Sequence, residues 1–315
     1  MSDDVEQHLE QRLGRVHARL RLEVETESGH RVFGGGINFF HPENWYSTHA
    51  LIRYCLKLSG FYNRGVRNAR NIQLRHNEFF VPKLPASFEN FRLLHLSDLH
   101  VDMDLEATRA IATTIRDLDY DLCVLTGDYR ARTFGSYDKT LEAMRLITEQ
   151  LRAPTYGVLG NHDSIRMVPG LESQGINMLL NESVVIERGD DRIALAGVDD
   201  AHYFRVHDIE KAADGIPDDM VSILLSHTPE IYRRAHYAQF DVMLSGHTHG
   251  GQICLPGGIP ITLDSRCPRR IGSGQWRYLD MLGYTSVGAG TSIVNVRLNC
   301  LPEVTLHRLR PGRTP

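Results

Sequence analysis

The stretch Phe91-Arg-Leu-Leu-His-Leu-Ser-Asp-Leu-His100 joins a strand-like run to two potential metal ligands. Residues 91–96 are leucine-rich and stop at polar residues, as a buried β-strand does. Asp98 and His100 follow directly. Because side chains two positions apart on an extended strand end point the same way, these two residues can hold one ion. The stretch therefore predicts a strand with a metal site at its carboxyl end.

Four later apolar runs repeat this arrangement. The runs and the motifs that follow them are 121–126 with Gly127-Asp128, 155–159 with Gly160-Asn161-His162-Asp163, 222–226 with His227, and 241–245 with Gly246-His247-Thr248-His249-Gly250. Apolar residues at helical spacing lie between the run at 91–96 and the run at 121–126, and again before the run at 155–159. This alternation predicts an α/β layered fold with much parallel pairing. In such sheets the loops beyond the carboxyl ends of the strands converge, so we expect the motifs to meet in one crevice.

The remaining sequence suggests an extension and further strands. Residues 1–90 predict an N-terminal helical extension, and residues 91–315 predict the domain that carries the motifs. In the extension, one helix starts at Ser2 and a second covers residues 45–62; their apolar positions are Val5, Leu9, Leu13, Val16 and Leu20 in the first, and Leu51, Cys55, Leu58 and Tyr62 in the second. Late segments at 193–198, 284–287 and 304–309 are expected to form a second, more antiparallel sheet.

Composition excludes several classes of protein. With 315 residues, 42% of them hydrophobic, the chain can bury a large core. Its net charge of −4 excludes a globally basic nucleic-acid binder, so we expect no stable nucleic-acid partner. The five cysteines are widely spaced, which indicates reduced thiols in the cytosol. The acidic start lacks the order of a signal peptide, and no apolar run approaches the roughly 18 residues of a membrane-spanning helix, so a cytoplasmic location is expected.

The ligand types indicate the chemistry. The set contains carboxylates, imidazoles and one amide but no thiolate: Asp98, His100, Asp128, Asn161, His227, His247 and His249. Mixed oxygen and nitrogen ligands suit Mn²⁺, Fe²⁺ or Zn²⁺. Seven ligands exceed the needs of one tetrahedral ion but suit two ions that share a carboxylate. Such a pair activates a water and clamps the entering and leaving oxygens during phosphate ester hydrolysis.

The ordered motifs DxH, GD, GNHD, a lone His and GHTH resemble those of the calcineurin-like metallophosphoesterases over roughly residues 91–310. The resemblance implies a four-layer α/β/β/α sandwich of two mixed sheets. It also implies two divalent ions, with Mn²⁺ the first choice, and attack on phosphorus by a hydroxide that they share. Asp98, His100, Asp128 and His249 would bind the first ion, and Asp128, Asn161, His227 and His247 the second. His162 would be the general acid, and Asp163 would hold its other ring nitrogen.

The substrate is less clearly indicated. Residues 246–256 and the leader Val81-Pro-Lys-Leu-Pro85 resemble a bacterial branch that includes membrane-associated phosphodiesterases and UDP-2,3-diacylglucosamine hydrolases. We expect cleavage of a phosphodiester or pyrophosphate, with lipid-linked and nucleotide substrates both left open. The alternatives are a broad phosphomonoesterase, a cyclic-nucleotide phosphodiesterase, and a non-catalytic scaffold that keeps the fold.

Outside the motifs, three features have two interpretations each. Arg130 and Arg266 are candidate contacts for a substrate phosphate, and the alternative is an ordinary surface position. His202 lies on a loop for which a solvated position is favoured over one above the site. Residues 51–77 contain six basic residues and no acid. Packing against the catalytic domain is favoured for this segment, and peripheral contact with the inner membrane through residues 45–76 is the alternative.

Overall fold

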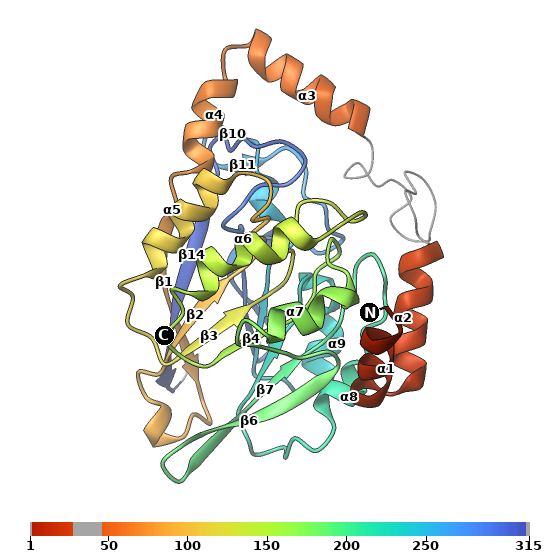
Figure 1. Ribbon diagram of the computed structural model, residues 1–315. Coiled ribbons are helices and arrows are strands. Elements are labelled where there is room, and N and C mark those ends of the chain that lie inside the picture. The colour runs from red at the N-terminus through yellow and green to blue at the C-terminus, as the bar shows by residue number, and fades with distance from the viewer. Residues whose placement is uncertain (1, 28–45, 313–315) are drawn as a thin grey trace.

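The computed structural model describes residues 2–27 and 46–312 (Figure 1). Two six-stranded mixed sheets form its centre. The first sheet contains, in spatial order, β1 (Gln73–Val81), β14 (Glu303–Pro311), β2 (Arg92–Leu96), β3 (Leu122–Leu125), β4 (Thr155–Gly157) and β5 (Ile176–Met178). The second contains β12 (Gly274–Tyr278), β13 (Met281–Thr285), β9 (Val242–Ser245), β8 (Ser222–Leu225), β7 (Asp191–Gly197) and β6 (Glu182–Arg188). A short hairpin joins β10 (Cys254–Leu255) to β11 (Ile259–Pro260).

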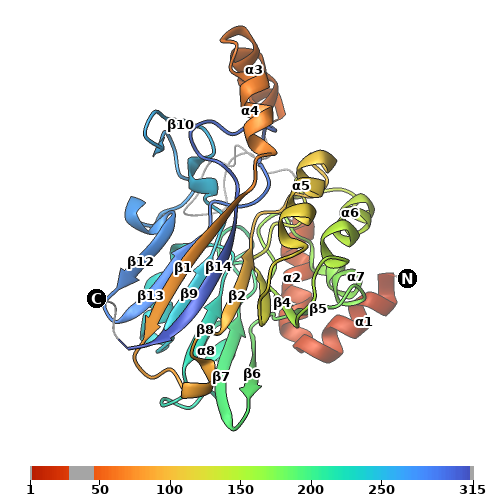
Figure 2. The same cartoon turned by 90° about the vertical axis from the view of Figure 1, so that its left-hand side faces the viewer.

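Three apolar clusters separate four layers and confirm the expected α/β/β/α sandwich. Between the sheets, β-branched and leucine side chains such as Val124 and Ile223 are almost fully buried. The outer face of the first sheet is covered by α5 (Leu105–Ile115), α6 (Asp138–Thr148) and α7 (Val168–Glu172), as Figure 2 shows. The outer face of the second sheet packs on α8 (Ile209–Ala213) and α9 (Tyr232–Tyr237).

The division of strands between the sheets differs in part from the sequence-based expectation. β7 and β13 belong to the second sheet, and each has one antiparallel neighbour, β6 and β12 respectively. On their other sides they pair in parallel with β8 and β9. The third late segment, β14, lies in the first sheet between β1 and β2, antiparallel to β2. Apolar runs look alike in either direction, so the sequence pattern did not distinguish these pairings. β1 belongs to the first sheet although it precedes residue 91, and the domain boundary at residue 90 stays a prediction.

The first expected helix is divided in two. Helix α1 (Ser2–Leu13) ends before Gly14, which has φ +86°, and α2 (Arg15–Glu27) follows. Leu9 and Leu13 are buried as expected. After the break, however, α2 buries Ala18 and Leu22, and Val16 is 80% exposed. A left-handed glycine that ends a helix redirects the chain, so the apolar spacing does not continue across it.

Helices α3 (Tyr46–Leu58) and α4 (Tyr62–Ala69) stand at one end of the sandwich (Figures 1 and 2). The expected apolar face of α3 is wrong: Leu51 and Leu58 are exposed, whereas Leu56 and Ile52 pack against residues 293–298. Among the described helices, none has both the length and the apolar character needed to cross a bilayer. Membrane contact through residues 45–76 stays a prediction, and residue 45 lies outside the described residues.

Candidate metal centre

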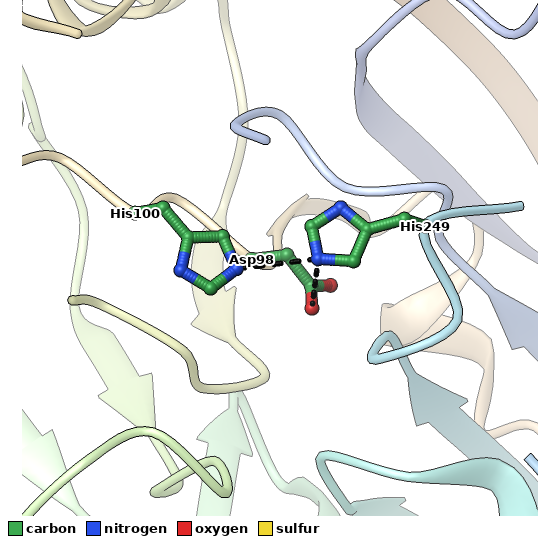
Figure 3. Close-up of side chains that lie close together, drawn as sticks. All are labelled: Asp98, His100 and His249. Carbon is green, nitrogen blue, oxygen red and sulfur yellow. Dashed lines mark hydrogen bonds and ion pairs between the residues drawn. The ribbon is translucent and has the colours of Figure 1, made fainter. Parts of the chain in front are cut away.

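The first ligand cluster joins residues that follow β2 and β9. Asp98, His100 and His249 direct their side chains toward one another (Figure 3). His249 Nε2 lies 3.2 Å from His100 Nε2 and 3.5 Å from Asp98 Oδ1. His100 Nδ1 lies 2.7 Å from the carbonyl oxygen of Arg130, which can only accept a hydrogen bond. The proton of a neutral His100 is therefore on Nδ1, and Nε2 presents its lone pair to the cluster.

The second cluster follows β3, β4, β8 and β9. Asp128, His227 and His247 are grouped, and Asn161 Oδ1 lies 2.8 Å from His227 Nε2. His227 Nδ1 donates to the carbonyl oxygen of Thr126 at 2.7 Å, so the Nε2 of a neutral imidazole faces Asn161 as a second acceptor. His247 Nδ1 lies 3.2 Å from the same nitrogen. With His227 neutral, a cation bound between these acceptor atoms would satisfy all of them.

Asp128 connects the two clusters. Its Oδ2 lies 3.4 Å from His227 Nε2 and 3.7 Å from His100 Nε2. All seven predicted ligands are buried, and the structure brings them together as expected from the strand ends.

The backbone at these ligands is unusual. Five of the seven have φ in the left-handed region: Asp98 (50°), His100 (40°), Asp128 (57°), His247 (71°) and His249 (50°). For a residue with a side chain this conformation costs roughly 1–2 kcal/mol. It turns the chain sharply at the strand ends, so the ligands face one point. Clustering of such residues is typical of functional sites.

Glycines beside the ligands provide the necessary space. A Cβ on Gly246 would lie 2.3 Å from Asp98 Oδ2, and one on Gly160 would lie 2.2 Å from Asp128 Oδ1. These distances are far below contact distance. Both motif glycines therefore allow backbone to pass directly against a ligand carboxylate.

The electrostatics fit divalent ions. Burial raises the pKa of Asp98 and holds the pKa of His249 well below its usual range, so His249 stays neutral, the form that binds metal. Burial also opposes a charge on His227, but the neighbouring Asp128 raises the His227 pKa to about 10. The cluster thus has a high affinity for positive charge. A divalent ion would supply that charge. His247 Nε2 is buried without a hydrogen-bond partner among the described residues, so this nitrogen lacks the partner that a bound ion would provide.

His162 lies at the edge of the centre, but its expected partner is wrong. Its Nε2 is 3.9 Å from Asp128 Oδ2, and its Nδ1 is 3.1 Å from the hydroxyl of Thr133. Asp163 does not hold this ring. Its carboxylate accepts backbone N–H groups of Asp128 at 2.7 Å and Gly160 at 2.8 Å. A buried carboxylate requires donors, and the amides of two adjacent loops satisfy it. Asp163 thus joins the GD and GNHD loops.

The two candidate substrate arginines have different surroundings. Arg130 is buried, and its guanidinium donates to the carbonyl oxygens of His162, Thr133 and Gly135. The guanidinium of Arg130 is therefore used within the protein: it positions the GNHD loop instead of contacting substrate as predicted. Arg266 is exposed, and its backbone N–H donates to Glu230 at 2.8 Å. Arg266 as a substrate contact stays a prediction.

His202 reaches the site, contrary to the solvated position that the sequence favoured. It is 3% exposed, and its ring centroid lies 4.0 Å from that of His247. His202 Nδ1 is 3.1 Å from Glu230 Oε2. Burial opposes its protonation, but this carboxylate outweighs burial and raises the His202 pKa to about 9. A charged His202 beside His247 opposes protonation of His247, which must be neutral to bind metal.

Sequence reasoning also missed a contact from the N-terminal helix α2. Arg21 is fully buried and donates to the carbonyl oxygen of Asp163 at 2.9 Å. It pairs with Asp199 at 3.4 Å and with Glu25 at 3.1 Å. Glu25 in turn accepts the hydroxyl of Ser164 and the backbone N–H of Ile165, both at 2.7 Å. Through these contacts, helix α2 anchors the loop that carries His162 and Asp163.

Replacement of Arg21 by methionine is expected to destabilise the protein and lower activity. The methionine side chain replaces the arginine stem but has no guanidinium, so the buried Asp199 loses its guanidinium partner, which typically costs about 3–5 kcal/mol. Urea unfolding measures the loss, and kcat measures the displacement of the loop. Arg19→Met, on the same helix at a 64% exposed position, is the control and should change stability by less than about 0.5 kcal/mol. Equal effects of both changes would contradict the positioning role.

Comparison with known proteins gives consistent results. Residues 91–251 match the calcineurin-like phosphoesterase family. The uncharacterized metallophosphoesterase YkoQ of Bacillus subtilis is 30% identical over 239 residues, covering 72% of this chain and 86% of that protein. The phosphodiesterase YaeI of Escherichia coli is 30% identical over 237 residues, covering 70% and 82%. A transmembrane protein with a metallophosphoesterase domain from Danio rerio is 31% identical over 252 residues, covering 72% of this chain but only 55% of that protein.

The match extends over half of the chain and includes the DxH, GD, GNHD and GHTH motifs, whose ligands converge in the structure. The lone His227 lies in the same matched range. On the strength of this match and these relatives, the chain belongs to the calcineurin-like phosphoesterase family and is a metal-dependent phosphoric ester hydrolase.

Proposed function

We propose that the protein is a dinuclear phosphohydrolase that cleaves a phosphodiester or pyrophosphate bond. The observation that carries this proposal is the position of Asp128, whose one carboxylate oxygen lies within 3.4–3.7 Å of an imidazole from each ligand cluster. A carboxylate between two converging ligand sets is the arrangement that two ions need in order to share a ligand. The phosphodiesterase name of the Escherichia coli relative supports a diester substrate.

The residues have separate tasks in this reaction. Asp98, His100 and His249 would hold one ion and Asn161, His227 and His247 the other, with Asp128 common to both. When bound, two divalent ions would activate the attacking water and neutralise charge on the phosphate. His162 lines the cavity beside Asp128 and is placed to donate a proton to the leaving oxygen. Thr133 restrains its ring from the other side.

The alternative of a non-catalytic scaffold is disfavoured by the same residues. A scaffold has no need to keep strained, buried ligands together with a histidine at the cavity edge. A phosphomonoesterase or a cyclic-nucleotide phosphodiesterase would use the same site on a different substrate. Rates with bis(p-nitrophenyl) phosphate, p-nitrophenyl phosphate and cyclic AMP distinguish these activities. Hydrolysis of the monoester alone would overturn the diester assignment.

Removal of metal is expected to abolish activity and lower thermal stability. Mn²⁺ is the first choice, and Fe²⁺ and Zn²⁺ suit the same oxygen and nitrogen donors. An ion present at a hundred times its dissociation constant stabilises the folded state by about 2.7 kcal/mol. Chelation followed by stepwise return of each metal, with hydrolysis and melting temperature measured together, tests this expectation. Full hydrolysis by protein that elemental analysis shows to be free of metal would contradict it.

We also propose that the protein works in a reducing compartment such as the cytoplasm. All five cysteines have free thiols, which supports this location.

A further inference from the structure

One cavity opens from the metal centre, and a second adjoins it along a shared edge. The first has a volume of about 390 Å³ and is lined by metal ligands of both clusters. The second has a volume of about 410 Å³. His162, Ser292 and Ile293 line both cavities. A substrate whose phosphorus lies beside His162 therefore has a separate space for each of its two substituents.

The first cavity provides an apolar surface beyond the metal ligands. Five aliphatic side chains form this isoleucine arm: Ile52, Ile253, Ile261, Ile293 and Val294. They come from α3, from the segment around the β10–β11 hairpin, and from the loop before β14. Because substrate phosphates and their metal ions need polar surroundings, an aliphatic wall at this place is suited to an apolar substituent.

The second cavity has the opposite character. Its basic residues, His49, Arg53 and Arg132, form an arginine arm. Among the described residues of its lining, the one acidic residue is Asp102. Its carboxylate already accepts hydrogen bonds from the backbone N–H of Ala131 at 2.8 Å and the hydroxyl of Thr140 at 3.0 Å. The excess of basic groups suits a further negative charge on the substrate.

Helix α3 contributes neighbouring residues to both arms, Ile52 to the isoleucine arm and Arg53 to the arginine arm. It precedes the residues 91–251 that match the family, so this feature is not part of the matched segment. We propose that α3 selects amphipathic phosphoesters: substrates with an apolar chain on one side of the reacting phosphorus and an additional anionic group on the other. This inference rests on the proposed function and narrows its substrate class.

A series of alkyl p-nitrophenyl phosphodiesters tests the isoleucine arm. The methyl, butyl and hexyl esters differ only in the length of the apolar chain, and all are used in clear solution below aggregation. Because each buried methylene contributes up to roughly fourfold in affinity, kcat/KM is expected to rise at least about tenfold from methyl to hexyl.

Two substitutions, one on α3 and one on the loop after β11, identify the arm. Ile52→Asp on α3 and Ile261→Asp on the loop should each reduce the hexyl-to-methyl ratio toward one. Ile261 is 55% exposed, so folding does not depend on it. Leu51→Asp is the matched control, because Leu51 is 61% exposed, adjoins Ile52 and lines neither cavity. It should keep the ratio of the parent protein.

Competitive inhibitors test the arginine arm. The monohexyl ester of methylenebisphosphonate has no P–O–P bond to cleave and carries one anionic group more than hexyl methylphosphonate, and the parent protein should prefer it. Arg53→Gln is expected to reduce that preference at least about threefold. Arg64→Gln, at an exposed position on α4 outside both cavities, should leave the preference unchanged.

The outcomes separate this inference from the proposed function. If methyl p-nitrophenyl phosphate is hydrolysed in a metal-dependent way but kcat/KM does not rise with chain length, the amphipathic substrate class is wrong and the hydrolase assignment stands. The same holds if Leu51→Asp lowers the ratio as much as Ile52→Asp. If no diester in the series and no pyrophosphate ester is hydrolysed with any metal, the proposed function itself is overturned.

Discussion

The Asp128→Ala protein is expected to have almost no hydrolytic activity, with a loss of at least about a thousandfold. Asp128 Oδ2 lies 3.4 Å from His227 and 3.7 Å from His100, so its removal takes a ligand from each cluster at once. The other ligand carboxylate, Asp98, is grouped with His100 and His249 of the first cluster. The measurements are the rate with bis(p-nitrophenyl) phosphate and the metal content of the purified protein, which should fall from two ions to one or none.

Two further variants make this result specific. Asp128→Asn keeps the shape of the side chain and an acceptor for the backbone N–H of His162, which donates to Asp128 Oδ1 at 2.9 Å. It should still lose most activity, because the negative charge is lost. Asp117→Ala, at an 87% exposed position, should match the parent protein. If Asp128→Ala hydrolysed the diester at the parent rate, the assignment of Asp128 as the shared ligand would be wrong.

The ligands could be predicted from sequence because each one is coded locally. The local pattern is an apolar run, then a glycine or polar turn, then an aspartate or histidine, as in residues 91–100. This pattern predicts both the strand and the ligand at its end. Parallel pairing then brings ends that are distant in sequence to one edge. His247 and Asp98 are 149 positions apart, yet the backbone N–H of His247 donates to the Asp98 carboxylate at 3.0 Å.

The supporting contacts could not be predicted in this way. Arg21 and Asp163 are 142 positions apart, and nothing in the helical pattern of α2 indicates a buried arginine. The partners of Asp163 are backbone N–H groups, which every residue except proline carries and which therefore give no sequence signal. The same limit explains β14, whose direction and sheet depend on neighbours rather than on its own apolar alternation.

The His162→Ala protein is expected to keep both metal ions while its turnover falls by about a hundredfold to ten-thousandfold for alkyl leaving groups. His162 lines both cavities, and its Nε2 lies 3.9 Å from Asp128 Oδ2. A general acid matters most when the leaving oxygen is strongly basic. The loss should therefore be much smaller for p-nitrophenolate than for an alkoxide.

The dependence on the leaving group distinguishes acid catalysis from simple positioning. In a series of phenyl phosphodiesters, the rate of the His162→Ala protein should fall more steeply with phenol pKa than that of the parent. Thr133→Val removes only the hydroxyl 3.1 Å from His162 Nδ1, so it should cost about tenfold or less and leave the slope near that of the parent. A uniform loss across the series in the His162→Ala protein would show instead that this side chain orients the phosphate, because only proton transfer to the departing oxygen makes the rate depend on that oxygen's basicity.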